Sequence, residues 1–241
     1  MQWHIGCSGF SYKEWKNTFY PPQLPQREWF AYYASVFPTV ELNVSFYRFP
    51  QLKMMQNWYI KSPRGFLFAV KAPRLITHLK KLNDCEELLK DFYNVCREGL
   101  KEKLGPVLFQ FPPSYQFTEE RLAKIISSAD PQFTNVIEFR HESWWKKEVY
   151  DAFKESNLIF CGESYPNLPD EAIVTAPVAY YRFHGIPALY YSEYDIAYLK
   201  KTADDFLKHK ELKEVYCFFN NTAALGAIAN AQWMGAYINR Q

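Results

Sequence analysis

Thr39-Val40-Glu41-Leu42-Asn43 is a short apolar stretch in which polar and apolar side chains alternate. Successive side chains of a β-strand point to opposite faces. If Val40 and Leu42 face a covering layer of helices, then Glu41 and Asn43 face the other way. This stretch therefore predicts a strand whose apolar face is packed and whose polar face carries functional groups near the carboxyl end.

The same arrangement recurs twice, in VIEFR and in VAYYRFH. The first of these stretches places Glu138 and Arg140 on the inward face, and the second places Arg182 and His184 there. Rings on the opposite face are expected to pack against helices; they include Phe68, Phe109, Phe139 and Tyr181.

Eight short runs rich in Val, Ile, Phe and Tyr are expected to be buried parallel strands. They cover residues 3–6, 39–43, 66–71, 107–111, 136–140, 158–162, 178–184 and 215–220. Seven helical patterns alternate with them, at residues 27–37, 52–61, 85–104, 119–128, 146–156, 194–208 and 223–238. Thr118 is expected to cap the helix at residues 119–128, and Thr222 the helix at residues 223–238.

This alternation predicts a (β/α)₈ TIM barrel, whose usual size is ~250 residues, as a single domain over residues 1–241. The alternative is an open, doubly wound sheet. Such a sheet usually has a glycine-rich phosphate loop after its first strand. The corresponding turn here, Gly6-Cys7-Ser8-Gly9, lacks one glycine of that pattern, so we prefer the barrel.

Composition narrows the class of protein further. The 241 residues are 48% hydrophobic and 22% charged with a net charge of +2, which excludes a disordered chain and argues against a dedicated nucleic-acid binder. No apolar run approaches the roughly 18 residues of a membrane span. The five cysteines are dispersed, without a CxxC pair, and no signal peptide is evident. We expect a cytoplasmic protein with no membrane partner.

Other strands also end in polar residues, which extend the pattern to Lys71, Gln110, Glu163, Asn220 and Asn221, while His4 and Ser8 share a parity on the first strand. The active sites of TIM barrels lie at the carboxyl ends of the strands. We therefore expect a functional site at this mouth. A closed ion-pair network that only plugs the barrel is the alternative, because buried charges must be paired.

Several longer motifs run through the chain in a fixed order. They are IGCSGFSYKEW, FYPPQLP, TVELNVSFYRFP, KLGPVLFQFPPSY, EFRHESWW, YYRFHG and FFNNT. Together they resemble the YecE-like family, domain of unknown function 72 (DUF72). The resemblance implies a TIM barrel and no established reaction beyond a loose similarity to sugar isomerases.

The resemblance also marks signature positions in this sequence. They are Gly6, Ser8, Gly9, Tyr12, Trp15, Glu41, Asn43, Phe46, Tyr47, Lys71, Gln110, Glu138, Arg140, His141, Trp144, Arg182, His184, Gly185, Asn220 and Asn221. Members of the family commonly carry an aspartate after the sixth strand. This sequence departs from that pattern, with Glu163 as the nearest acid.

The candidate catalytic residues are Glu41, Glu138, His184 and Lys71. The glutamates would act as acid or base, His184 would shuttle a proton, and Lys71 would hold an oxyanion or, if strongly desolvated, form a Schiff base. The expected substrate is a small anionic or sugar-like molecule, and a phosphorylated sugar is one such candidate. Its binding residues would be Ser8, Tyr12, Asn43, Tyr47, Gln110, Arg140, His141, Trp144, Arg182, Asn220 and Asn221.

The reaction stays open among isomerase, lyase and hydrolase chemistry, and the sequence specifies no cofactor. Glycoside hydrolysis would need Glu41 and Glu138 about 5 to 10 Å apart. Glu41, Glu138, His141, Glu163 and His184 are conceivable metal ligands. However, the HxxxH and HExxH spacings are missing, so we assign no metal site. Arg182 has a purely structural alternative role, in an ion pair with Glu41 or Glu138.

A nucleic-acid-binding barrel is the alternative function, because rings beside basic groups can stack unpaired bases. The rings expected in the mouth loops are Phe10, Tyr12, Trp15, Phe46, Tyr47, Trp144, Trp145, Tyr190 and Tyr191. Loop packing is the other explanation for these rings. The sequence leaves the oligomeric state open.

Overall fold

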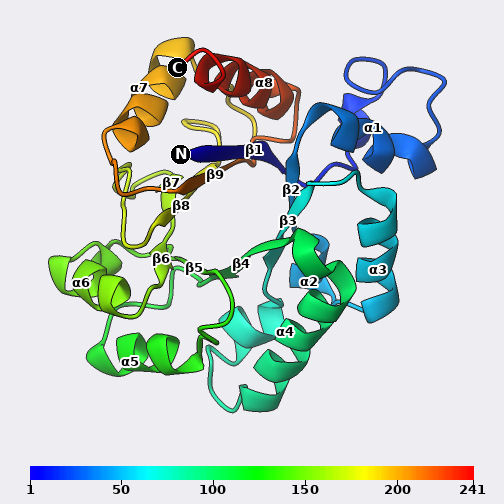
Figure 1. Ribbon diagram of the computed structural model, residues 1–241. Coiled ribbons are helices and arrows are strands. Elements are labelled where there is room, and N and C mark those ends of the chain that lie inside the picture. Colours follow the sequence, from blue (N-terminus) through cyan, green and yellow to red (C-terminus); the bar gives the residue numbers. More distant parts are fainter.

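The computed structural model describes all residues from Met1 to Gln241. Nine parallel strands form a nearly closed barrel with helices on its outside (Figure 1). The strands are β1 (Gln2–Ser8), β2 (Thr39–Leu42), β3 (Leu67–Lys71), β4 (Leu104–Gln110), β5 (Asn135–Glu138), β6 (Ile159–Phe160), β7 (Gly162–Ser164), β8 (Val178–Phe183) and β9 (Glu214–Phe219). This is a TIM-type barrel, as the alternating pattern predicts.

The ninth strand arises because the sixth expected strand is divided. Only Cys161 separates β6 from β7. β6 pairs with β5 through Val136 and Ile159, whereas β7 pairs with β8 through Glu163 and Arg182. The division therefore lies at the one place where the ring of backbone pairing is incomplete.

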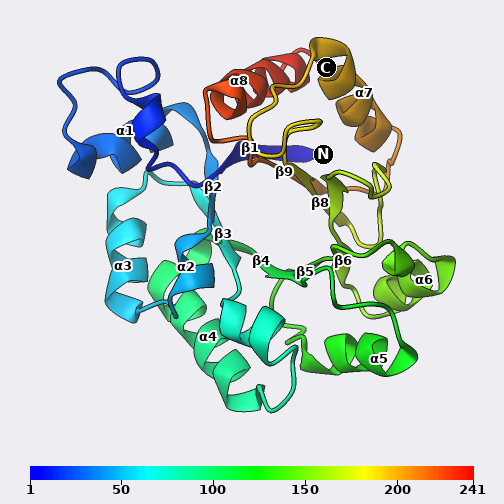
Figure 2. The same ribbon diagram turned by 180° about the vertical axis from the view of Figure 1, so that it is seen from behind.

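The helices are α1 (Trp29–Val36), α2 (Val44–Tyr47), α3 (Leu52–Lys61), α4 (Glu86–Leu100), α5 (Glu119–Ser128), α6 (Lys147–Glu155), α7 (Ile196–Leu207) and α8 (Gly226–Ile238). All except α2 lie within the predicted stretches; a four-residue helix is too short to show a helical period. The last helix, α8, packs beside the first strand, β1, and completes the outer ring seen from both sides (Figure 1 and Figure 2).

Two separate apolar layers confirm the predicted strand faces. Phe68, Phe109, Phe139 and Tyr181 lie in the large core between the barrel and the helices. A smaller core fills the barrel interior below the polar mouth; it consists of Ala69, Leu108, Val136, Ile159, Cys161, Tyr180, Tyr216 and Phe218. Alternation along each strand thus sends neighbouring side chains into different layers.

Of the two predicted helix caps, one is present. The Thr118 hydroxyl accepts a hydrogen bond from the Arg121 backbone N–H at 3.2 Å and so caps α5. The prediction for Thr222 is wrong, because α8 begins at Gly226 and its N-cap position is Leu225. The extra turn between Thr222 and Gly226 is too short for residue pattern alone to separate it from the helix. No helix is long and apolar enough to cross a membrane.

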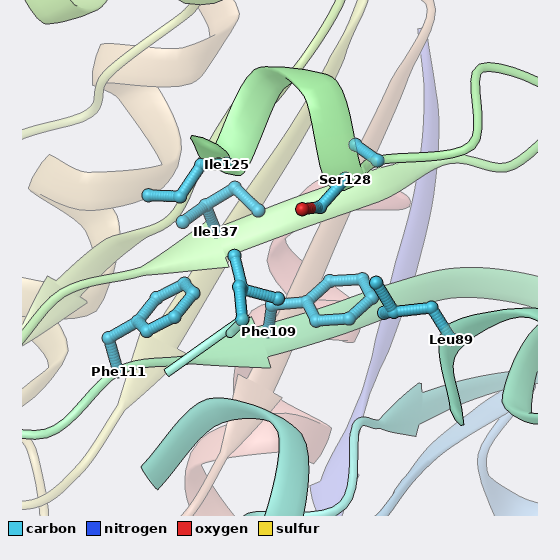
Figure 3. Close-up of a pocket in the computed structure, with 8 residues that line it drawn as sticks. Leu89, Phe109, Phe111, Ile125, Ser128 and Ile137 are labelled. Carbon is cyan, nitrogen blue, oxygen red and sulfur yellow. The ribbon is translucent and has the colours of Figure 1, made fainter. Parts of the chain in front are cut away.

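A small apolar cavity lies in the outer layer (Figure 3). Its volume is about 10 Å³, and its lining includes Leu89 of α4, Phe109 of β4, Ile125 of α5 and Ile137 of β5. A space of this size holds at most about one water molecule. It lies on the helix side of β4 and β5, so it is a packing gap and no part of the barrel mouth.

Candidate functional site

Polar side chains from several strands meet inside the barrel at its carboxyl end. Glu41, Glu138, Glu163 and His184 are 0% exposed and Arg182 is 1% exposed. Such deep burial of charge is stable only when the charges are paired and hydrogen-bonded. The structure therefore brings together three carboxylates, two arginines and a histidine that lie far apart in the sequence.

Arg182, which lies within β8, is the centre of the lower half of this network, the half farther from the mouth. Its Nε and Nη2 donate to the two oxygens of Glu41 at 2.9 and 2.7 Å, and its Nη1 donates to Glu138 at 2.6 Å. Tyr180 donates to the same Glu41 carboxylate at 2.6 Å. The structural alternative for Arg182 is thus the arrangement observed, because its fork is saturated by two carboxylates.

Arg140 forms the upper half. Its guanidinium contacts Glu138, and its Nη1 lies 2.6 Å from the Glu163 carboxylate. Its Nη2 lies 2.9 Å from His184 Nε2, and its planar group stacks over the Tyr165 ring at 4.0 Å. Arg140 therefore contacts three acceptors at once, although neither its Nη1 nor either Glu163 oxygen makes a hydrogen bond.

Glu138, Glu163 and His184 are also the one set of side chains placed as metal ligands would be, with ligand atoms within 4.8 Å of one another. Imidazole and carboxylate groups suit first-row metals. Arg140, however, already contacts all three of these groups. A metal ion would have to displace this guanidinium, because its positive charge already lies against the two carboxyl groups and the imidazole.

The two carboxyl groups beside Arg140 differ in their protonation. Burial would raise the pKa of Glu138, but Arg140 and Arg182 together outweigh burial and lower that pKa. Burial raises the pKa of Glu163 well above its usual range; Arg140 opposes this rise, and repulsion from Glu138 adds to it. Although Glu163 lies within ion-pair distance of Arg140, we infer that Glu138 carries the negative charge and Glu163 the proton.

His184 is held in its neutral form. Burial, followed by the charges of Arg140 and Arg182, lowers the pKa of His184 well below its ordinary value. Arg140 can only donate, so Nε2 must accept and Nδ1 must carry the proton. The Asn220 amide nitrogen lies 2.9 Å from Nδ1, so this tautomer requires the Asn220 amide to be turned with its oxygen in that place. This environment does not favour the predicted proton shuttle at neutral pH.

Lys71 differs from every other charged group of the mouth because its ammonium makes no hydrogen bond or ion pair. The residue is 9% exposed, and its Nζ lies 4.1 Å from the centre of the Phe46 ring. Burial, followed by repulsion from Arg182, lowers the pKa of Lys71 to about 7. Lys71 is therefore a buried amine that is partly neutral at neutral pH.

Other predicted binding residues lie around this network. Ser8 pairs with Glu41 across β1 and β2, and its hydroxyl has no partner. The Asn43 amide oxygen is also buried without a partner. Gln110 donates to the Phe111 carbonyl at 2.7 Å, and Tyr12 donates to the Ser8 carbonyl at 2.5 Å. Tyr47 is 81% exposed at the rim, so only its backbone position is tied to the mouth.

Three predicted binding residues lie elsewhere. Trp144 is fully buried in the outer layer, where its ring stacks on Phe139 at a centroid distance of 3.9 Å. The Asn221 amide donates to the Ser192 carbonyl and to the side chain of Asn230 in α8. His141 accepts from the Ser143 backbone N–H at 3.2 Å and caps a short helical turn.

The rings expected in the mouth loops divide in the same way. Trp15 is fully buried, as Trp144 is. Its indole donates to the Ala224 carbonyl at 3.0 Å. The expectation that Trp15 and Trp144 line the mouth is therefore wrong, because both rings are fully buried in the large core and both indoles have backbone acceptors.

Sequence reasoning missed three residues of the site. Tyr180 and Tyr165 contact Glu41 and Arg140, respectively. His78 packs edge-on against Phe46 at 5.0 Å, in a π-helical turn (Leu75–Leu79) after β3. Alternation along β8 indicates that Tyr180 shares the inward face with Arg182; no local signal marks the other two.

The fold and this mouth define a TIM-type barrel with a polar constellation at the carboxyl ends of its strands. A family model described as protein of unknown function DUF72 matches residues 4–241. The chain therefore belongs to the DUF72 family, as the ordered motifs indicate.

Curated relatives agree with this assignment. UPF0759 protein YunF of Bacillus subtilis (strain 168) is 26% identical over 265 residues, covering 96% of this chain and 93% of the relative. UPF0759 protein YecE of Escherichia coli (strain K12) is 27% identical over 116 residues, covering 48% of this chain and 42% of the relative.

Solved structures of the family share the fold. A DUF72 family protein (TM1631) from Thermotoga maritima MSB8 has a TM-score of 0.90 and 29% identity, covering 99% of this chain and 100% of its own. A second one (EF0366), from Enterococcus faecalis V583, has a TM-score of 0.86 and 23% identity, covering 99% and 96%. Neither description names a reaction.

Proposed function

We propose that this protein is an enzyme that binds a small anionic or sugar-like, phosphorylated molecule at the barrel mouth and transfers a proton to or from it. The observation that carries this proposal is that buried polar atoms without a partner gather at the strand ends. Ser8 Oγ and Asn43 Oδ1 are two such atoms, and β3, the neighbour of β2, ends in Lys71, whose ammonium makes no hydrogen bond or ion pair with the protein. Native proteins leave few buried polar groups unpaired, and those that remain often await a ligand or water.

The network suggests how the work is divided. Glu41 and Arg182 form a saturated lower layer that supports the groups above it. Arg140 and Lys71 supply positive charge toward the mouth for an anion. Lys71 is the candidate proton carrier, because a general acid or base works best with a pKa near the operating pH.

Calorimetric titration with sugar phosphates, sugar acids and the matching neutral sugars tests this proposal. We expect an anionic member of the series to bind and Lys71→Met to weaken that binding by about 10- to 100-fold, as for a charged hydrogen bond of ~1.5–3 kcal/mol. Lys147→Met, which changes an exposed lysine on α6, is the matched control. Binding by none of these compounds, or equal binding by Lys71→Met, would contradict the proposal.

The nucleic-acid alternative rests on rings exposed beside the basic groups, and Tyr47 and Tyr191 are 81% and 66% exposed. A titration with single-stranded DNA and RNA at two salt concentrations separates the two functions. Salt-dependent binding that Lys71→Met abolishes would favour nucleic acid, because phosphate contacts release counterions.

A further inference from the structure

The two most deeply buried lysines of this protein have opposite environments. Lys103 donates to the Tyr59 carbonyl at 2.8 Å and to the carbonyl and hydroxyl of Ser62 at 2.7 and 2.8 Å. Lys71, at the carboxyl end of β3, has no acceptor at all and faces the ring of Phe46. A lysine buried for structural reasons is expected to look like Lys103, so the environment of Lys71 needs another explanation.

The surroundings of Lys71 favour an uncharged amine. The aromatic wall excludes water from one side, while Arg140 and Arg182 place two permanent positive charges nearby. Desolvation and neighbouring cations are the two means by which proteins turn a lysine into a nucleophile. Glu138 and Glu41 also lie near this amine and partly oppose the lowering of its pKa.

We propose that Lys71 is a covalent catalyst that forms an imine with the carbonyl carbon of an aldehyde or ketone substrate. This inference rests on the proposed function, and it narrows the substrate class to open-chain sugars or other anionic molecules that carry a carbonyl group. It also fits the lack of a protein acceptor on the amine, since an acceptor would stabilise the protonated ammonium, which has no lone pair with which to attack.

The step balances without an oxidant or reductant. The neutral amine attacks the carbonyl carbon, a C–N bond forms, and the carbonyl π electrons move to oxygen. A proton passes from nitrogen to that oxygen, giving a carbinolamine. A second proton then makes the hydroxyl leave as water, and a protonated imine remains. This cation can accept the electron pair of an adjacent C–H or C–C bond, so it suits isomerase and lyase chemistry alike.

Two neighbouring groups shape the charge around Lys71. His78 packs edge-on against Phe46, and burial followed by repulsion from Lys71 lowers its pKa to about 4, so it adds no positive charge near the amine at pH 7. Glu138, kept ionised by two arginines, lies on the other side and offers a negative charge to the protonated imine. Its charge favours the intermediate over the free carbonyl compound.

Reductive trapping at pH 7 tests the proposal. The protein is incubated with pyridoxal 5′-phosphate, an anionic aldehyde, or with glycolaldehyde, a small neutral one. It is then reduced with borohydride and digested for peptide mass spectrometry. An ordinary lysine has about one neutral amine in 2,500 at pH 7, whereas half of a group with a pKa near 7 is neutral. We expect Lys71 to be labelled at least ~10-fold faster than exposed lysines such as Lys147.

Variants and the comparison with binding complete the test. Lys71→Arg keeps the charge and should lose the fast label, whereas Lys147→Met should retain it. Wild-type protein in which both aldehydes label surface lysines and leave Lys71 unmodified would overturn the covalent step. If sugar phosphates still bind in that case, the proposed function stands and only the imine is rejected; if nothing binds, both are rejected.

Discussion

Two buried carboxyl groups of this mouth, Glu138 and Glu163, differ in how many guanidinium groups they contact. Glu138 contacts Arg140 and Arg182, whereas Glu163 contacts Arg140 alone. Both are completely buried, so the desolvation of the two groups is comparable. The additional contact with Arg182 therefore explains why the pKa of Glu138 is lowered, whereas that of Glu163 is raised.

This difference predicts opposite costs for one chemical change. Glu138→Gln leaves two buried arginines undercompensated and should lower the free energy of unfolding by about 3–5 kcal/mol. Glu163→Gln replaces a group that is already neutral and should change it by less than ~1 kcal/mol. Urea unfolding at pH 7 measures both values. Similar costs for the two variants would show that Glu163 is ionised in the folded protein.

At the scale of elements, alternation and capping determine where each helix and strand lies. The barrel strands carry large apolar side chains on their outer faces, and α5 begins directly after the hydroxyl of Thr118. Its first turn holds Glu119 and Glu120, which complement the positive end of the helix dipole. One local hydrogen bond, from the Arg121 N–H to the Thr118 hydroxyl, thus marks the point where the loop ends and α5 begins.

Removal of that hydrogen bond should be measurable. Thr118→Ala should destabilise the protein by about 1 kcal/mol, because the Arg121 N–H loses its acceptor. Thr118→Asp should restore most of the loss, since aspartate is an equally good cap. Thermal unfolding of the three proteins measures the effect. A Thr118→Asp variant as unstable as Thr118→Ala would argue against capping.

At the scale of the whole molecule, the burial of Lys71 without a partner lowers the stability of the fold. The pKa of Lys71 is lowered from 10.5 to about 7 on folding. Between these values the unfolded chain holds a proton that the folded chain does not. The contribution of this residue to stability therefore rises with pH through that window and is least favourable below pH 7.

Replacement of this lysine should consequently stabilise the fold. We expect Lys71→Met to be more stable than the wild type at pH 7, and its advantage to shrink by at most about 1.4 kcal/mol per pH unit towards pH 8.5. Denaturant unfolding across that range measures the difference. Lys103→Met is the control and should be destabilised, because three oxygen acceptors lose their donor. An equal loss of stability in both variants would refute the unpaired environment of Lys71.

Much of the candidate site follows from local pattern. The parity of Glu41, Glu138 and Arg182 on their strands was enough to place these side chains inside the barrel, because backbone alternation is a local property. Trp144 shows where that reasoning stops. It follows a strand end as the others do, yet its ring turns back onto Phe139 in the outer layer. The position of a loop side chain depends on neighbours that the local pattern does not specify.

By itself, the sequence determined the barrel, most of its elements and the inward faces of its strands, since periodicity and turn residues act over a few positions. It did not show α2 or the division between β6 and β7. The tertiary structure alone decided which charges pair. Arg182 takes both Glu41 and Glu138, Arg140 takes Glu163, and Lys71 remains without a partner. The physical reason is that an ion pair between strands depends on the distance and orientation of the two side chains. That geometry is fixed only when the barrel closes.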